Sequence, residues 1–464
     1  MFDRRRMLLG AGALGVAMPI VGLARTQAPL DLIGDIQQRA FRFFWERANP
    51  ANGLMPDRWP TNSFSSIAAT GFALTAYPIG VEHGWISRAQ ARERVLATLR
   101  FFWNAPQGSQ PTGVSGHKGF FYHFLDMQTG LRFRDTELST IDTTLLLGGI
   151  LFAEMYFDQP EEAEIRDLAR RIYARCDWRW FQQQDAGKRV SMGWHPESGF
   201  IELPWSGYTE GLILYILALG APELSLGRDA YDGWASTYPS FWRDSNAGRF
   251  LAFAPQFGHQ YTQCWVDLRG PRDATMRAAG FDYFENSRRA TVAQRDYAIA
   301  NPGGWKGYGP NIWGMTACDG PADTVIAGRQ FHGYAARGPV GQPDGLDDGT
   351  IAPTAAIASL PFAPEIATRA AYALHDRYGS AIYRDYGFLD SFNPSFTARG
   401  MAVQNGRVTA VAGWVDGDYL GIDQGPIIAM IENHRTGLVW RYIRRHPAIR
   451  RGLLRAGFTG GWLA

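Results

Sequence analysis

Carboxylates recur at one kind of position in this sequence, directly before an apolar run of helical length. The cases are Asp142 before TTLLLGGIL, Glu210 before GLILYILALG, Asp348 before GTIAPTAAIASL and Asp423 before QGPIIAMIEN. An acid at a helix start commonly accepts backbone N–H bonds and suits the helix dipole, so capping is the better explanation for each acid taken alone. Glu210 is explained less well in this way, because Ser206 and Thr209 precede it and are better caps.

Several carboxyl groups that meet at one cleft could hydrolyse a glycosidic bond. One must hold a proton for the leaving oxygen, and apolar neighbours raise the pKa of such a group. A second must be ionised, to activate water or to attack the sugar. Glu210, close to Trp205, Tyr208 and a run of leucines, has the setting of the acid. Asp142 and Asp423, in more polar stretches, both suit the ionised role.

Two further polar clusters fall in segments that we interpret as loops. FGHQYTQCWVDLRG carries His259 and Gln260, and DYFENSRRATVAQRDYAIANP carries Glu285 and Arg288. For the second segment, structural ion pairs and substrate binding are about equally good explanations. Cys318 is expected to be a small buried residue rather than a nucleophile. HEXXH, GxSxG, P-loop and GxGxxG patterns are absent from the sequence, which argues against zinc proteases, serine esterases and nucleotide-binding proteins.

Apolar and amphipathic helical patterns alternate along the chain. Amphipathic or mixed periods fall at 30–48, 87–105, 160–181 and 364–379, and nearly uniform apolar runs at 66–84, 141–157, 209–220, 349–360 and 423–434. Helices that are apolar all round belong inside a fold, so the pattern predicts an all-α toroid of inner and outer helices. The Gly/Pro-rich segments 103–135 and 301–323 are predicted to be long irregular loops on the cleft face.

Composition narrows the class of protein. The 464 residues are 46% hydrophobic and 19% charged with a net charge of +2, which predicts a large core and no nucleic-acid partner. Aromatic residues make up 14% of the chain, including 16 Trp, a hint of sugar binding. The basic C-terminal stretch RYIRRHPAIRRGLLR is most simply a solvated helix face, and an interaction site is the less favoured alternative.

The first 28 residues read as an export signal. A basic start with Arg4 and Arg5 precedes an apolar run and small residues at Ala24 and Ala28, as in twin-arginine signal peptides. The run is short and interrupted by Gly and Pro, so no stable membrane anchor is expected. We predict a signal peptide over 1–28, a single catalytic domain over 29–464 and a periplasmic location.

A set of motifs, in order, resembles the glycoamylase-like domain. The motifs are ELSTIDTTLLLGGIL, GWHPESGF, PWSGYTEGLILYILALG, FGHQYTQCWVDLRG, DYFENSRRATVAQRDYAIANP, GYGPNIWGMTACDGP, DDGTIAPTAAIASLPFAPE, YGFLDSFN and IDQGPIIAMIENHRTGLVW. This domain is typical of glycoside hydrolase family 144, the bacterial endo-β-1,2-glucanases, and is similar to a domain of cyclic β-1,2-glucan synthases. The resemblance covers roughly residues 30–440.

The resemblance implies an (α/α)6 barrel that hydrolyses β-1,2-glucan with inversion and without a metal or other cofactor. It implies that Glu210 is the proton donor and that Asp142 and Asp423 are acids of the cleft, without deciding which acts on water. In some relatives, acids near Glu285 take a catalytic role. Residues predicted to bind the β-1,2-linked substrate are Trp205, Tyr208, Trp194, His195, His259, Gln260, Glu285, Arg288, Asp319 and Trp414.

Three alternatives stay open at this stage. The same fold could serve an exo-acting enzyme on sophoro-oligosaccharides or a transglycosylase. A polysaccharide lyase would use Tyr122 with His123, or His259 with Tyr261, as its base. The third alternative is a non-catalytic glucan-binding protein of the cell envelope. A monomer is expected in every case.

Overall fold

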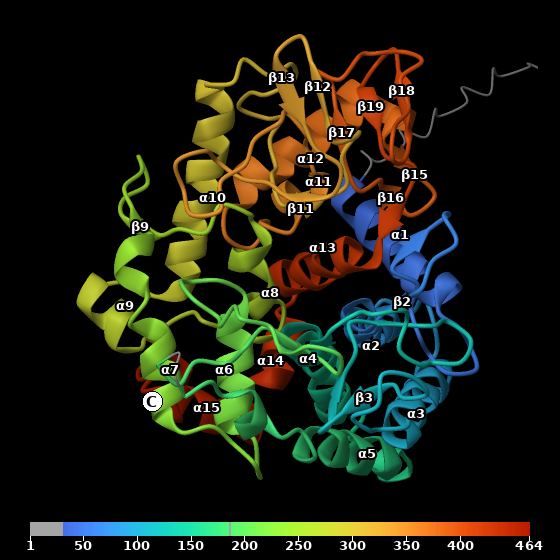
Figure 1. Ribbon diagram of the computed structural model, residues 1–464, viewed down its shortest axis with the longest axis vertical. Helices are drawn as coiled ribbons and strands as arrows, with labels where there is room; N and C mark the ends of the chain where they lie inside the picture. The colour runs from blue at the N-terminus through green and yellow to red at the C-terminus, as the bar shows by residue number, and fades with distance from the viewer. Residues whose placement is uncertain (1–30, 185–186) are drawn as a thin grey trace, which may run out of the picture. The chain divides into compact units, whose positions relative to one another are not determined.

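A computed structural model describes residues 31–184 and 187–464 (Figure 1). The signal peptide predicted over 1–28 lies outside these residues. The α-helices of the described part are α1 (Leu32–Arg47), α2 (Ile67–Glu82), α3 (Arg88–Asn104), α4 (Thr140–Tyr156), α5 (Ala163–Ala174), α6 (Gly211–Gly220), α7 (Arg228–Ala235), α8 (Phe257–Trp265), α9 (Ala274–Ala279), α10 (Tyr283–Ala300), α11 (Pro353–Ile357), α12 (Pro364–Tyr378), α13 (Gly421–Arg435), α14 (Leu438–Ile443) and α15 (Pro447–Arg455).

The helix-rich class predicted from periodicity is confirmed. The apolar helices contact one another: α2 packs on α4 and α13, α4 on α6, and α13 on α11. Helices α4, α6 and α13 also contact α8. The amphipathic helices flank them, with α3 on α2, α5 on α4, α12 on α11 and α15 on α6. Closure into an (α/α)6 barrel stays a prediction. Residues Leu32–Ala464 form one compact unit, and none of the helices in the described residues is long and apolar enough to cross a membrane.

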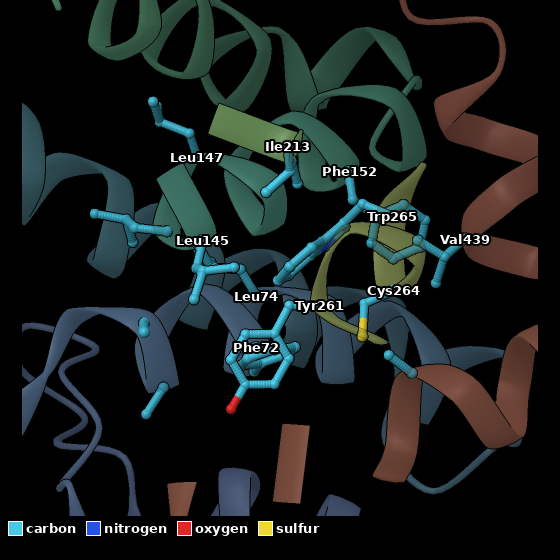
Figure 2. Packing of buried hydrophobic residues seen from close by; sticks show 14 of the residues in the cluster. Phe72, Leu74, Leu145, Leu147, Phe152, Ile213, Tyr261, Cys264, Trp265 and Val439 are labelled. Atoms are coloured by element: carbon cyan, nitrogen blue, oxygen red, sulfur yellow. The ribbon is translucent and has the colours of Figure 1, made fainter. Parts of the chain in front are cut away.

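Trp265 of α8 lies in the core where the apolar helices meet, among side chains from α2, α4 and α6 (Figure 2). Its ring stacks on Phe72 with centroids 4.8 Å apart, and its Nε1 donates to Thr75 Oγ1 at 2.9 Å. Helices α2 and α4 approach so closely that a Cβ on Gly149 would lie 1.9 Å from Gly71 O. Glycine is therefore required at this crossing, which fixes how α2 and α4 sit against each other.

Three apolar helices begin directly after a short strand. β2 (Ser65–Ser66) leads into α2, β6 (Leu138–Ser139) into α4 and β20 (Tyr419–Leu420) into α13. These strands are held by antiparallel pairing with β5 (Phe124–Leu125), β7 (Gly193–His195) and β1 (Arg58–Trp59), respectively. Ser66 and Ser139 then cap α2 and α4. The ladders thus fix the entry of each helix and the side chains of its first turn.

Short antiparallel ladders also occur within and beside the segments predicted to be irregular. Segment 103–135 contains β3 (Gly116–His117), β4 (Phe120–Phe121) and β5. The remaining strands are β8 (Gly199–Phe200), β9 (Trp242–Arg243), β10 (Phe250–Leu251), β11 (Ala317–Cys318), β12 (Thr324–Ile326), β13 (Arg329–Phe331), β14 (Ala335–Ala336), β15 (Tyr383–Arg384), β16 (Gly387–Phe388), β17 (Phe392–Asn393), β18 (Arg407–Thr409) and β19 (Gly413–Val415).

Three local predictions are corrected by the structure. The segments carrying His259 and Glu285 are not loops but the helices α8 and α10. Their buried faces carry polar side chains that other elements satisfy, so the apolar period expected of a helix is missing. The apolar run 349–360 forms only the five-residue α11, which starts at Pro353.

Candidate active site

Glu210 stands immediately before α6 but does not cap it. Its backbone is already helical and its side chain makes no capping bond, whereas Thr209 Oγ1 accepts from Gly211 N at 3.1 Å. The residue is 8% exposed, and its buried Oε2 has no hydrogen-bond partner. Burial raises the pKa of Glu210 to about 8, against a hydrogen bond from its own backbone N–H, and the charges of Asp142 and Asp344 add to the rise. At this helix start, desolvation outweighs the dipole, and the group holds a proton at neutral pH.

Asp142 lies in the first turn of α4 and is buried. Ser139 Oγ accepts from the Asp142 backbone N–H at 3.1 Å and donates to Asp142 Oδ2 at 2.5 Å. Asp142 Oδ1 lies 3.4 Å from His123 Nε2. The pKa of Asp142 is raised overall by burial, although the His123 charge and the Ser139 hydroxyl favour its ionised form and oppose that rise. Asp142 is therefore the acid near Glu210 whose ionised form has dedicated partners.

His123 joins Asp142 to a third acid, Glu137, which directly precedes β6. The His123 Nδ1 atom lies 2.9 Å from Glu137 Oε1. The His123 backbone is fixed as well, since its N–H donates to Glu137 O at 3.0 Å and its carbonyl accepts from Ile67 N at 3.3 Å. Although burial lowers it, the pKa of His123 rises to about 9 overall, because Asp142, Glu137 and Asp57 favour its charged form.

A second group of carboxyls gathers at the start of α13. Asp319 is paired with Arg58 at 2.6 Å, and the Asp319 backbone N–H donates to Asp390 Oδ2 at 2.8 Å. Burial raises the pKa of Asp390 to about 7, with the Asp319 charge next in importance. Asp390 Oδ1 and Asp423 Oδ2 are buried without a hydrogen-bond partner among the described residues, and burial together with the Asp390 charge raises the pKa of Asp423 well above its usual range. Two buried carboxyls whose charges act on each other are not both ionised at neutral pH.

Two tyrosines lie close to these acids. The buried Tyr261 senses the charges of Asp423 and Glu210, and the hydroxyl of Tyr334 is near both Asp423 and Asp390. Tyr334 is 61% exposed, unusual for an aromatic residue beside buried acids. A pocket of about 330 Å³ adjoins the second group and is lined by Arg58, Thr61, Asn62, Ser63, Phe64, Asp319, Gly320, Gln404 and Asn405. An exposed aromatic ring near carboxyl groups is a surface on which a sugar ring can stack.

Strand register separates two predicted binding residues. Trp194 pairs with Leu138, so the next position places His195 opposite Glu137. Trp194 stacks on His117, with ring centroids 5.3 Å apart. Because neighbouring side chains on a strand point to opposite faces, His195 is on the Glu137 face and Trp194 is on the other.

Three predicted binding residues are buried in the fold. Tyr208 packs on His259, with ring centroids 5.2 Å apart. His259 Nε2 bonds to Phe253 O at 3.2 Å, and burial lowers the pKa of His259 to about 4, so its ring is neutral. Gln260 Nε2 donates to Ser359 Oγ at 2.9 Å. Their roles in substrate binding remain predictions.

Glu285, Arg288 and Trp414 also have internal partners. Glu285 is paired with Arg288 at 2.6 Å and with Arg289 at 2.8 Å, and these arginines hold its pKa below the usual range despite its partial burial. The buried Trp414 donates from Nε1 to Asn405 O at 2.8 Å. Trp205 is buried beside Gly211, and its Nε1 donates to Thr140 Oγ1 at 3.1 Å, which ties the start of α6 to that of α4.

Several site residues escaped the sequence analysis. His123 had been considered as the base of a lyase, and Asp390 lies within the quoted motif YGFLDSFN, but neither had been placed beside an acid of the cleft. Glu137 also lies within a quoted motif, ELSTIDTTLLLGGIL, but was not singled out, and Tyr334 lies outside the quoted motifs. Asp348, by contrast, lies in a buried pair with Arg337 at 2.8 Å. Cys318 is buried, and burial raises the pKa of its thiol well above the usual range, as expected of a structural cysteine.

Two sets of side chains in the described residues have potential ligand atoms within 4.8 Å of one another, the typical spread of a metal site. They are His123, Glu137 and Asp142, and Asp319, Asp390 and Asp416. In the first set, each ring nitrogen of His123 already faces a different carboxylate, so the ring serves as a cation. In the second, Arg58 supplies positive charge to Asp319. No residue is assigned as a metal ligand.

Comparisons with known proteins place the chain in a family. Residues 202–447 match the Glycoamylase family, described as "Putative glucoamylase". The crystal structure of a "putative glucoamylase" from Bacteroides uniformis is 30% identical and has a TM-score of 0.79, with 94% of this chain and 100% of that chain covered. An endo-β-1,2-glucanase from Chitinophaga pinensis, solved with sophorotriose and glucose, is 26% identical with a TM-score of 0.77, over 93% and 99% of the two chains.

One curated relative is also named for an activity on β-1,2-linked glucose. The exo β-1,2-glucooligosaccharide sophorohydrolase (non-reducing end) of Parabacteroides distasonis is 28% identical over 449 residues, which are 91% of this chain. The chain spans 57% of that relative's length. The predicted resemblance to the glycoamylase-like domain is thus confirmed, and the chain belongs to the Glycoamylase family.

Proposed function

We propose that this protein is a glycoside hydrolase that cleaves β-1,2-glucan with Glu210 as the general acid. The observation that carries the proposal is the buried Glu210 carboxyl, which has an unpartnered oxygen and a pKa raised to about 8. Such a group is protonated at neutral pH and has a free oxygen to present to a leaving group. The names of the relatives from Chitinophaga pinensis and Parabacteroides distasonis support β-1,2-linked glucose as the substrate.

Asp142 is the better choice for the ionised partner. Its charge acts on Glu210, and His123 and Ser139 stabilise its carboxylate form. Burial and the charge of Asp390 favour the protonated form of Asp423, so Asp423 suits hydrogen bonding to sugar hydroxyls. Asp319 and the exposed Tyr334 would complete the binding surface on that side.

The reaction then follows from the two protonation states. Glu210 transfers its proton to the glycosidic oxygen as the bond to the anomeric carbon breaks. Asp142 accepts a proton from a water molecule whose oxygen bonds to that carbon. The products are a new reducing end and an alcohol, and proton exchange with solvent restores Glu210 and Asp142. Attack by water opposite the leaving group gives inversion, the outcome that the family resemblance implies.

The proposed scaffold is a single (α/α)6 barrel that opens at the starts of α4, α6 and α13. This arrangement is supported by the contacts among the apolar helices and by the likeness to the solved glucanase. The same starts carry Asp142, Glu210 and Asp423. The predicted export to the periplasm and the monomeric state belong to the same proposal, and cell fractionation and light scattering test them.

Two alternatives keep the fold and change the outcome. The Parabacteroides distasonis relative supports exo release of sophorose, and the Chitinophaga pinensis relative supports endo cleavage. A sugar hydroxyl in place of water would give transglycosylation. A lyase is disfavoured, because a cleft rich in carboxyls would repel a uronate. A protein that only binds glucan would leave the shifted pKa of Glu210 without a use.

The test is reducing-end release from β-1,2-, β-1,3- and β-1,4-glucans by the wild type and by Glu210→Gln. We expect release from β-1,2-glucan alone, reduced at least ~100-fold in the variant. Early products of mixed length would indicate endo cleavage, sophorose alone would indicate exo cleavage, and products longer than the substrate would indicate transfer. Proton NMR of the first anomer formed reports inversion or retention. Wild-type turnover by Glu210→Gln would refute the acid assignment.

A further inference from the structure

His123 is held from both sides by acids that belong to different parts of the fold. Its Nδ1 lies 2.9 Å from Glu137 Oε1, before β6, and its Nε2 lies 3.4 Å from Asp142 Oδ1, on α4. Neutral imidazole has one N–H and one lone pair, and a lone pair directed at a carboxylate would be repelled. Both nitrogens can serve these carboxylates only when both carry protons.

The position of the His123 ring is fixed independently of these contacts. Its backbone bonds to Glu137 O and accepts from Ile67 N, at the starts of α4 and α2. Its ring stacks on Phe124 with centroids 3.8 Å apart, and Phe124 packs on Phe64 at 4.1 Å. The ring therefore does not need Asp142 to stay in place, and it can act on that acid as a fixed cation.

We propose that His123 is a positioning residue: as an imidazolium clamped between Glu137 and Asp142, it keeps Asp142 ionised and directs its carboxylate toward the reacting water. This inference rests on the proposed function of Asp142 as the base. Glu137 supplies a negative charge on the far side of the ring, so the His123 ring stays protonated when Asp142 takes up a proton during turnover. Other titratable groups around the clamp are Asp57, which favours the charged ring, Glu210, which interacts with Asp142, and His195, which interacts with Glu137.

The first test reads the charge of the ring without using activity. Nitrogen-15 NMR of histidine-labelled full-length protein, assigned with His123→Gln, should show both His123 nitrogens protonated at pH 7 and still protonated at pH 8. Glu137→Gln should lower the midpoint of that titration by at least ~1 pH unit. A single protonated nitrogen at pH 7 would overturn the inference, as would two N–H signals that are lost when Zn²⁺ is added to EDTA-treated protein.

The second test measures the pH dependence of kcat/KM on β-1,2-glucan. In His123→Gln the acidic limb of the pH profile should move to a pH ~1–3 units higher, because Asp142 loses the neighbouring imidazolium and its pKa rises. At a pH below both limbs, a shift of one unit means about tenfold lower kcat/KM. The control is His117→Gln, which removes a half-buried histidine from the same segment that stacks on Trp194 instead of pairing with acids. The control should leave the limb in place.

The outcomes separate this inference from the proposed function. If the wild type hydrolyses β-1,2-glucan and His123→Gln retains the wild-type limb, the positioning role is refuted and the function stands. If the wild type does not hydrolyse β-1,2-glucan, the function fails, and the NMR result still decides whether the imidazolium clamp exists. A His123→Gln variant that lowers kcat equally at every pH would show a merely structural role and refute the inference.

Discussion

Replacing Glu210 with Gln should stabilise the protein at neutral pH while removing its activity. Glutamine is neutral and nearly isosteric, so it mimics the protonated carboxyl that the fold prefers. The pKa of Glu210 rises from 4.5 in the unfolded chain to about 8 in the folded protein. The folded state therefore binds the proton more tightly, and the unfolding free energy falls as pH rises between these two values.

The size of the effect follows from that interval. Each pH unit within that interval lowers the unfolding free energy by about 1.4 kcal/mol. Relative to a side chain that stays protonated, the wild type therefore loses about 3 kcal/mol at pH 7 and about 5 kcal/mol above pH 8. Below pH 4.5 both states are protonated and the loss vanishes. Urea unfolding, followed by tryptophan fluorescence from pH 4 to 9, should show Glu210→Gln and wild type nearly equal at pH 4.5 and diverging as pH rises.

Glu285→Gln is the matched control, with the opposite sign. Arginines hold the pKa of Glu285 below its usual range, so this acid contributes stability above the unfolded pKa that is lost as pH falls through the folded value. Its replacement should cost about 1 kcal/mol at neutral pH and little in acid. A stability difference between Glu210→Gln and wild type that does not change with pH would refute the reasoning for Glu210.

Three further predictions test the binding surface, the core and a buried ion pair. Tyr334→Ala should raise KM on β-1,2-glucan about five- to tenfold with little change in kcat, whereas the control Tyr372→Ala, at a half-exposed tyrosine, should change neither. Equal KM values for Tyr334→Ala and the wild type in steady-state assays would contradict a stacking role. Gly149→Ala should lower the unfolding free energy by ~1–3 kcal/mol, measured by urea titration, and an unchanged midpoint would disprove the tight crossing of α2 and α4. Arg337→Met should cost ~3–5 kcal/mol by leaving Asp348 charged and unpaired, and the double variant with Asp348→Leu should recover most of that loss; no recovery would refute the ion-pair explanation.

Most of the helical framework could be predicted because each helix carries a local signal. The apolar run 141–157 and the amphipathic period 87–105 are both visible in the sequence, and the structure has α4 and α3 there. Helices α8 and α10 were missed because their buried polar residues are satisfied from other elements. Gln263 Nε2, for example, donates to Ser287 Oγ at 2.7 Å, between α8 and α10. Such a contact has no counterpart in local periodicity.

The basic C-terminal stretch shows the same limit. It was expected to be a solvated helix face, and Arg450 and Arg455 are indeed exposed. In addition, Arg455 donates to Leu219 O at 2.8 Å and Arg451 donates to Gly220 O, at the end of α6. These carbonyls lack partners within their own helix, so the arginines complete its C-terminus. The charge pattern alone cannot distinguish solvation from capping of a distant helix.

The candidate site, too, could be predicted only in part. Glu210 and Asp142 were predicted because an acid before an apolar run can be seen in the sequence. The protonation states of these acids depend on tertiary contacts: burial for Glu210, and for Asp142 the nearby His123, whose backbone is held by Glu137 and Ile67. The acids can be identified in the sequence, but which of them holds a proton depends on the tertiary structure.

The most direct test of Glu210 as the general acid compares two leaving groups. Glu210→Gln should lose about 100- to 10,000-fold in kcat/KM on a sophoro-oligosaccharide, whose sugar must be protonated to depart. The same variant should retain near-wild-type kcat/KM on a dinitrophenyl β-sophoroside, because dinitrophenolate leaves without a proton. Equal losses on both substrates would contradict the assignment, because they would mean that Glu210 contributes something other than the proton.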